Sequence, residues 1–121
     1  MYYTKHVTLT NNTLTTLFSI PNGYVVYINY VFVANHGTAA NNLDLKWTNS
    51  SDVDQLYLFD GTSIAGGAKE TLGGQSDAPI FVLHNGDIVK AQASQATGNM
   101  EVAITFKLVE QPQAFSNFNG S

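Results

Sequence analysis

The chain contains three histidines, His6, His36 and His84, and no cysteine, which narrows the metal and acid–base chemistry that it could perform. The histidines lie far apart in the sequence, and none has a carboxylate at a spacing typical of a metal or catalytic pair. His84 stands three positions before Asp87, but a polar contact across a turn explains that spacing equally well. We therefore expect no catalytic residue and no metal ligand among them.

The carboxylates offer little more chemistry. Asp52, Asp54 and Asp60 flank a strand-like segment and could supply oxygen ligands to calcium, but their spacing does not match an EF-hand loop, and Asp before Gly61 is a common turn pair. Nothing brings two carboxylates together in an apolar pocket for glycoside hydrolysis. The chain has neither a Gly-x-Ser-x-Gly elbow nor a phosphate-binding Gly-Lys-Ser/Thr loop. We expect a protein that is not an enzyme and holds no cofactor.

The aromatic residues suggest a binding surface instead. Trp47, together with the tyrosines, could form a platform on which a sugar ring stacks. Trp47, however, falls on the same predicted strand face as Leu43 and Leu45, which favours a place in the core.

Composition limits the class of partner. The chain has 121 residues, a formal charge of −4, five lysines and no arginine, which is unfavourable for direct binding of nucleic acid. The absence of cysteine excludes disulfides and thiolate metal sites. There is no N-terminal signal pattern and no run of about eighteen apolar residues, so we expect a soluble protein that does not interact with a membrane.

Apolar residues recur with the period of a β-strand, and no segment of helix length shows an apolar stripe. We predict a single all-β domain over residues 1–110, built as a two-sheet antiparallel β-sandwich of jelly-roll or immunoglobulin-like type, with closure into a barrel as the alternative. Asn85-Gly86 is predicted to form a tight type I′ hairpin, and residues 60–76 a long glycine-rich loop with a short strand inside it. The predicted strands are 2–9, 13–20, 24–35, 43–49, 54–60, 69–72, 79–84, 87–94 and 100–110.

Segment 24–35 differs from the other predicted strands because both of its faces are apolar. Val26, Ile28 and Phe32 alternate with Tyr27 and further valines. Such a strand is either central in its sheet or has its outer face against another subunit.

Residues 111–121 form a short extended C-terminal tail with no periodicity, and they carry Phe115 and Phe118. Burying a phenylalanine is worth roughly 1.5–3 kcal/mol, whereas fixing each backbone residue costs roughly 1–2 kcal/mol. Two rings cannot order this tail unaided. Either it is loose in the isolated subunit, or it pairs with an edge strand of a neighbour while the rings fill pockets there.

Three segments together resemble small β-sandwich virion proteins of tailed bacteriophages. They are Ser19-Ile20-Pro21-Asn22-Gly23, the strand end Val33-Ala34-Asn35-His36-Gly37-Thr38-Ala39-Ala40, and Val82-Leu83-His84-Asn85-Gly86-Asp87-Ile88-Val89-Lys90-Ala91. The likeness covers residues 19–110, and its motifs are turn motifs.

The resemblance implies a non-enzymatic structural protein of the virion, made in the host cytoplasm, such as a capsid decoration or cement protein or a neck or tail accessory protein. Its partners would be phage capsid or tail proteins, and we expect a homo-oligomer, with a trimer favoured. The alternative is a carbohydrate- or receptor-binding module of a tail or fibre. The residues predicted to lie at interfaces are Tyr2, Tyr3, Gly66, Gly67, Gly73, Gly74, Phe115 and Phe118.

Overall fold

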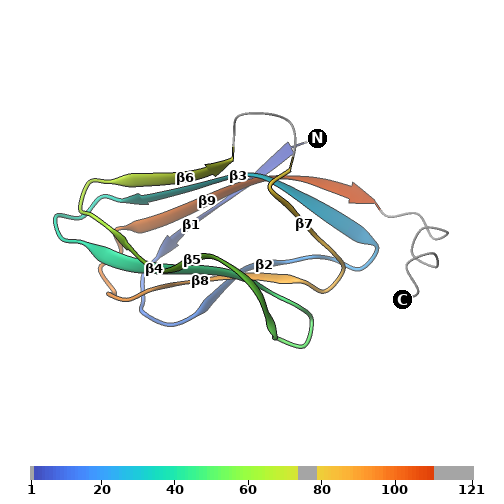
Figure 1. Ribbon diagram of the computed structural model, residues 1–121, viewed down its shortest axis with the longest axis horizontal. Coiled ribbons are helices and arrows are strands. Elements are labelled where there is room, and N and C mark those ends of the chain that lie inside the picture. The colour runs from blue at the N-terminus through green and yellow to red at the C-terminus, as the bar shows by residue number, and fades with distance from the viewer. Residues whose placement is uncertain (1, 74–78, 111–121) are drawn as a thin grey trace.

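The computed structural model describes residues 2–73 and 79–110, and every regular element within them is a β-strand. Figure 1 shows these strands as two layers that pack face to face. No helix in the described part of the chain has the length and apolar character needed to cross a lipid bilayer. The strands are β1 (Tyr2–Leu9), β2 (Thr15–Ser19), β3 (Tyr24–Asn35), β4 (Asn41–Thr48), β5 (Asp54–Ile64), β6 (Lys69–Gly73), β7 (Phe81–Leu83), β8 (Ile88–Ala93) and β9 (Met100–Glu110).

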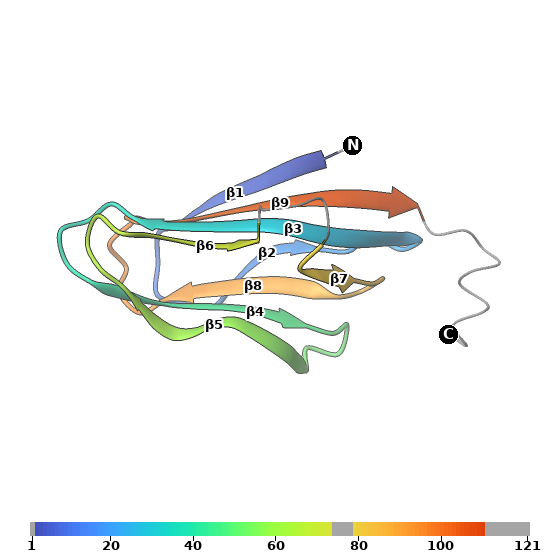
Figure 2. The same ribbon diagram turned by 45° about the horizontal axis from the view of Figure 1, so that its top comes forward.

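The strand order identifies the type of sandwich. The five-stranded sheet has the order β1-β9-β3-β6, with β7 also pairing β3, and the four-stranded sheet has the order β2-β8-β4-β5. All pairs are antiparallel. This is the order of an eight-stranded jelly roll, to which β7 adds a short strand. The predicted two-sheet antiparallel sandwich is therefore confirmed, and the jelly-roll alternative describes its topology (Figure 2).

The core lies between the two sheets and follows strand alternation. On β9, Met100, Val102 and Ile104 are buried, while Glu101 and Ala103 between them are only half-buried. β4 and β8 alternate in the same way from the opposite layer. Every second side chain therefore meets the facing sheet, as the period of a strand requires.

β3 departs from simple alternation at Asn29. Ile28 pairs with Phe106 and Tyr30 with Thr105, so Asn29 is an extra residue inserted between two consecutive pairs of the β3–β9 register. Such a bulge shifts the strand by one residue and reverses which side chains point inward. This explains why the segment is apolar on both faces. β3 lies between β9 and the strands β6 and β7, so the predicted alternative of a central strand is the one observed.

Two turns pack against each other at one end of the sandwich. The Ile20 N–H donates to the Asp87 carbonyl at 2.9 Å, and the Gly86 N–H donates to the Ile20 carbonyl at 3.2 Å. The Asp87 carboxylate accepts from the His84 backbone N–H at 2.8 Å, which is the turn contact that the spacing of these two residues suggested. The β2–β3 and β7–β8 connections thus stabilise each other.

The predicted type I′ hairpin at Asn85-Gly86 is wrong. β7 belongs to the five-stranded sheet and β8 to the four-stranded sheet, so the turn crosses between layers. Gly86 has a φ of 85°, whereas Asn85 is not among the residues with positive φ. One positive φ at the third position is the type II pattern, and a type I′ turn needs two.

The prediction for residues 60–76 is wrong in its first part: residues 60–64 belong to β5, whereas the short strand expected inside the loop is present as β6, and residues 74–76 lie outside the described residues. β5 continues through Asp60 and Gly61 to Ile64, because the Gly61 N–H donates to Asp44 Oδ1 at 2.6 Å and Gly61 adopts a φ of 58°. The connection to β6 is a short turn at residues 65–68, closed by a hydrogen bond from the Ala68 N–H to the Ala65 carbonyl at 3.0 Å.

Asn35 joins that turn to the β3–β4 connection. Its side chain is buried and donates to the carbonyls of Ala39 at 3.0 Å and Ile64 at 2.9 Å, and its Oδ1 accepts from the Gly37 N–H at 3.0 Å. One amide therefore satisfies two backbone groups of the β3–β4 connection and one at the end of β5.

We expect replacement of Asn35 by Ala to lower the free energy of unfolding by about 1–3 kcal/mol, because buried backbone groups lose their partners. Chemical denaturation measures this change. The matched control is Asn42→Ala on β4, where the side chain is exposed, and its effect should be small. Equal destabilisation by the two variants would contradict the role given to Asn35.

Candidate functional site

The outer surface of the five-stranded sheet carries a column of aromatic side chains along β3. Before the bulge Tyr27 points away from the core, and after it Tyr30 and Phe32 do so, since Ile28 and Val31 are fully buried. All three outward aromatic side chains are half-buried. The bulge keeps them on the same surface, where simple alternation would have turned Tyr30 and Phe32 inward.

The register of the sheet sets the neighbours of this column. Thr4 of β1 and Thr105 of β9 lie in one row with Tyr30, and their hydroxyl groups are hydrogen-bonded at 3.1 Å. Four such rows of outward-pointing residues make up the surface that we call the "outer face". The rows are Tyr2, Lys107, Tyr27 and Val82; Thr4, Thr105, Tyr30 and Gly73; His6, Ala103, Phe32 and Thr71; and Thr8, Glu101, Ala34 and Lys69.

A shallow pocket occupies one end of the outer face. It has a volume of ≈ 440 Å³ and is lined by Tyr2, Tyr27, Asn29, Pro79 and Lys107. Lys107 stands between the two tyrosines in register, and none of the ion pairs within residues 2–73 and 79–110 involves it. The pocket therefore combines two aromatic rings, an amide and a cation.

At the other end of the outer face, two histidines bind one carboxylate. His6 Nε2 lies 3.1 Å from Glu101 Oε1, and His36 Nε2 lies 2.9 Å from Glu101 Oε2. Glu101 is opposite Thr8 on β1 and Ala34 on β3, so the two imidazoles approach it from opposite diagonals. They bracket the carboxylate and do not converge on a common point beside it.

The two contacts link β1, β9 and the β3–β4 connection. Exposed ion pairs of this kind contribute about 0–1 kcal/mol each to the free energy of unfolding. Within the described residues, no group of three or more His, Cys, Asp or Glu side chains is arranged to hold a metal ion.

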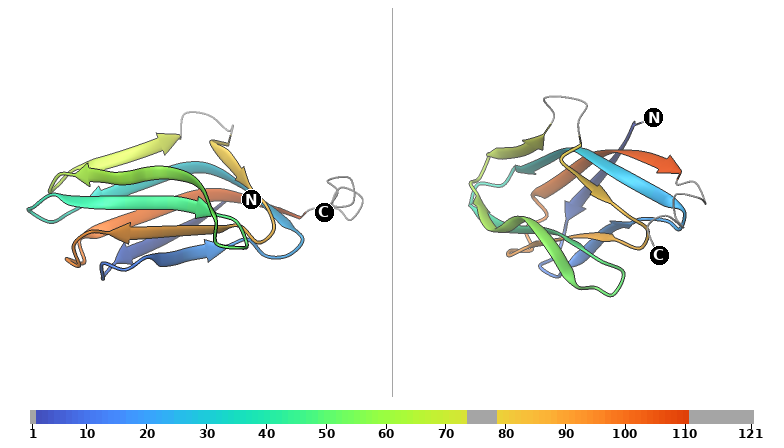
Figure 3. Two further views of the ribbon diagram at one scale, coloured as in Figure 1. Left: turned by 60° about the horizontal axis from the view of Figure 1, so that its bottom comes forward. Right: turned by 45° about the vertical axis from the view of Figure 1, so that its right-hand side comes forward.

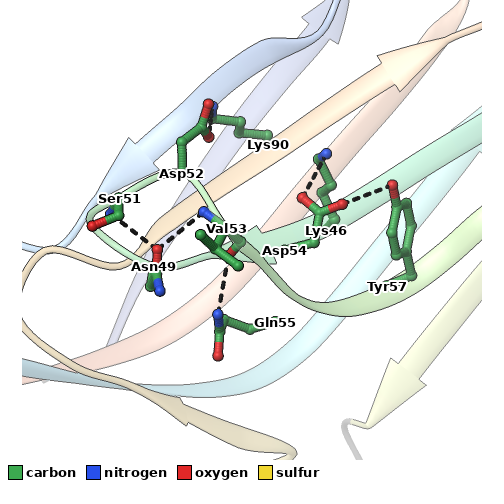
Figure 4. A network of polar contacts seen from close by, with 9 residues as sticks. All are labelled: Lys46, Asn49, Ser51, Asp52, Val53, Asp54, Gln55, Tyr57 and Lys90. Atoms are coloured by element: carbon green, nitrogen blue, oxygen red, sulfur yellow. Dashed lines mark hydrogen bonds and ion pairs between the residues drawn. The ribbon is translucent and has the colours of Figure 1, made fainter.

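The outer surface of the four-stranded sheet carries a different polar group, drawn in Figure 4. Lys46 of β4 and Lys90 of β8 are directly opposite each other, an arrangement that is unfavourable for like charges. Asp54 binds Lys46 Nζ at 2.8 Å, and Asp52 forms an ion pair with Lys90. Asp52 of the β4–β5 connection and Asp54 at the start of β5 thus neutralise the two lysines.

The β4–β5 connection is shaped by Asn49. Its Oδ1 accepts from the backbone N–H groups of Ser51 at 2.9 Å and Val53 at 3.0 Å. Asp52 takes a φ of 63°, a left-handed conformation that Asp tolerates better than most residues. Two of the three aspartates considered as calcium ligands, Asp52 and Asp54, therefore form ion pairs with lysines, and Asp54 also accepts from the Tyr57 hydroxyl at 3.2 Å.

The ion pair shifts the titration of both partners. The hydrogen bond from Lys46 holds the pKa of Asp54 below its ordinary value, with a smaller contribution from Tyr57. The hydrogen bond to Asp54 in turn raises the pKa of Lys46. The stabilisation from Asp54 is therefore complete above about pH 4 and is lost as the pH falls through its lowered pKa. That from Lys46 is lost only in strongly alkaline solution.

The predicted interface residues do not form one cluster. Tyr2 belongs to the outer face, whereas Tyr3 points to the opposite side of β1 and stacks on Phe106, with ring centroids 5.8 Å apart. Gly66 and Gly67 lie in the turn between β5 and β6, and Gly73 ends β6 beside Tyr30. Gly74, Phe115 and Phe118 lie outside the described residues.

The two glycines of that turn meet different constraints: Gly66 is packed against the backbone of Thr38, whereas a Cβ atom on Gly67 would meet nothing within 4 Å, and Gly67 adopts a φ of 78°. A Cβ atom on Gly66 would stand 2.5 Å from the Thr38 carbonyl carbon, and the Gly67 N–H donates to the Asn35 carbonyl at 2.7 Å. Trp47 is half-buried and stacks on Phe81, with centroids 5.7 Å apart, so it packs with the core as its position predicted.

Sequence reasoning missed the Glu101 contacts, the paired lysines and the aromatic column. Glu101 is far from His6 and His36 in the chain, and only the pairing of β9 with both β1 and β3 brings them together. The one available signal was the apolar character of both faces of segment 24–35. It indicated that side chains of β3 would need a neighbour outside the core.

Comparison of the chain with protein-family models and with curated proteins finds no match. The geometry of the outer face and the turn motifs therefore carry the functional inference.

We expect Lys46→Met to raise the pKa of Asp54 toward its ordinary value, because it removes both the hydrogen bond and the nearby positive charge. Tyr57→Phe removes only the phenolic hydrogen bond and should cause a smaller rise. NMR titration of the side-chain carboxyl group measures both. A rise with Tyr57→Phe equal to or larger than that with Lys46→Met would contradict the assignment of Lys46 as the main cause.

Proposed function

We propose that this protein is a non-enzymatic structural protein of a bacteriophage particle, a capsid decoration or cement protein that works by binding. The observation that carries the proposal is the aromatic column of Tyr27, Tyr30 and Phe32 on the outer face. Half-buried aromatic side chains on the outside of a β-sheet suit docking onto another protein, because aromatic side chains contribute much of the binding energy at interfaces.

The turn motifs support the proposal. The segments that resemble small phage virion proteins form the two turns that join at Ile20 and Asp87, together with the strand end at Asn35. These motifs therefore shape connections at both ends of β3. Jelly rolls occur in viral capsid proteins and in lectins, although a fold by itself does not assign a function.

In the proposed mechanism, the outer face docks on shell subunits and water is excluded from the aromatic column. Full burial of one such side chain is worth roughly 1.5–3 kcal/mol, and several copies bound to one particle reinforce each other through multivalency. Residues 111–121, with Phe115 and Phe118, would add a second point of attachment.

We expect Phe32→Ser and Tyr30→Ser each to weaken binding to particles assembled without this protein, by about tenfold. Co-sedimentation with such particles measures the bound copies at a series of concentrations. The matched control is Leu56→Ser, which removes an exposed apolar side chain from β5 in the other sheet and should bind as the wild type does. Unchanged binding by both outer-face variants, with the fold intact, would exclude this docking surface.

A second candidate function follows from the pocket at the end of the outer face. Two tyrosine rings, the Asn29 amide and the Lys107 ammonium group are the kinds of group that bind carbohydrate, and the volume lies in the range of ligand sites. In this alternative the protein is a carbohydrate- or receptor-binding module of a tail or fibre.

A glycan array distinguishes the two functions. If the pocket binds carbohydrate, we expect saturable binding of a glycan that Tyr27→Ala abolishes, because this variant removes one wall of the pocket. Tyr57→Ala, in the other sheet, should leave the binding unchanged. An array without any bound glycan would favour the decoration function.

A further inference from the structure

β1 is an open edge of the five-stranded sheet. It pairs with β9 in an unbroken register from Tyr2 opposite Lys107 to Leu9 opposite Met100, and no other described strand pairs with it. Residues 2–6 are all exposed. Figure 3 shows β1 at the margin of its layer, so its free backbone groups face outward along most of the strand.

The other edges of the two sheets are interrupted. β2 changes register between Thr16 and Phe18, and β5 changes register against β4 at three places. The edge opposite β1 is divided between the short strands β6 and β7. Bulges and short strands prevent edge-to-edge association. β1 has neither, and its sequence contains no proline or glycine.

We propose that β1 pairs with β1 of a second copy in an antiparallel, two-fold arrangement centred on Thr4. This inference extends the proposed function and does not depend on it, because it concerns association of the free protein. An antiparallel pair of identical edge strands has a two-fold axis perpendicular to the sheet. Its main-chain hydrogen bonds supply much of the affinity.

Charge disfavours the neighbouring register centred on Lys5 and favours the one centred on Thr4. Lys5 is the only charged residue of β1 apart from the imidazole of His6, and a pairing centred on Lys5 would place two ammonium groups opposite each other. Centring on Thr4 places Lys5 opposite the partner's Tyr3, where the ammonium group can lie over the ring. Tyr2 then lies opposite the partner's His6, on the outer side.

The pairing would join the two five-stranded sheets into one. Opposite residues of an antiparallel pair point to the same side of the sheet, so both outer faces would be presented in the same direction. The aromatic columns of two copies would then act together on one partner surface, which raises their combined affinity. Tyr2 and Tyr3, exposed by 50% and 45% in the single chain, would both become covered.

Cysteine cross-linking tests the pairing and its register. The chain has no cysteine, so a disulfide-linked dimer can form only through an introduced residue. In Thr4→Cys the two Cα atoms would be about 4.5–5.5 Å apart, within disulfide range. In Thr8→Cys, a matched threonine on the same side of β1, they would be roughly 25 Å apart.

We expect Thr4→Cys to form a dimer under oxidising conditions, seen by non-reducing electrophoresis, and Thr8→Cys to remain monomeric. Equal cross-linking of the two variants, or none in either, would overturn the proposal. Both reduced variants should melt at the wild-type temperature, since each loses one exposed hydroxyl group.

A variant of the full chain identifies the occupant of the edge. Residues 111–121 of another copy could also add a strand to β1. Thr4→Cys combined with Phe115→Ser and Phe118→Ser should still cross-link if β1 pairs with β1. Loss of the dimer in that variant would show that the tail drives association and would overturn the proposal.

Discussion

The whole five-stranded sheet depends on one extra residue in its central strand. Asn29 shifts β3 against β9, so Val26 and Ile28 face the core before it, and Val31 and Val33 face the core after it. Without this bulge, strict alternation would expose one half of the strand's valines and isoleucines. The same shift decides the composition of the outer face. A packing requirement inside the molecule therefore determines which aromatic side chains a partner would meet outside it.

The outer face is uneven in a way that follows from strand order. Its β1 and β9 side carries hydroxyl groups and the Glu101 contacts, whereas its β3 side carries the aromatic column. The two charged residues that β9 contributes to the outer face, Glu101 and Lys107, lie in its last and first rows. A docking partner would meet an aromatic strip bordered along β9 by Thr105 and Ala103, with a charged group near each end, which suits a surface that must remain in water before it is covered. The open edge of β1 lies on the polar side, away from the column.

Strand positions were largely predictable because they depend on local alternation and turn residues. All of the predicted strand segments correspond to observed strands, and the sandwich class was confirmed. The errors came where a side chain elsewhere changed the outcome. Asp44 accepts a hydrogen bond that carries β5 through Gly61, and Asn85-Gly86 joins two layers because β7 pairs with β3. The Glu101 contacts required the pairing of distant strands, which no local pattern in a single sequence encodes.

The jelly-roll order has a consequence for how the molecule forms. β9 lies between β1 and β3, and β8 lies between β2 and β4, so each sheet is completed by a strand from the last part of the described chain. Contacts between residues separated by nearly the whole domain are slow to form, because a long loop must close first. During synthesis on the ribosome, β1 and β3 must wait for β9 before the backbone groups that face it are paired. Folding of this domain is therefore expected to be an all-or-none event that waits for β9 to be synthesised, and until then the side chains of the aromatic column are not held in a completed sheet.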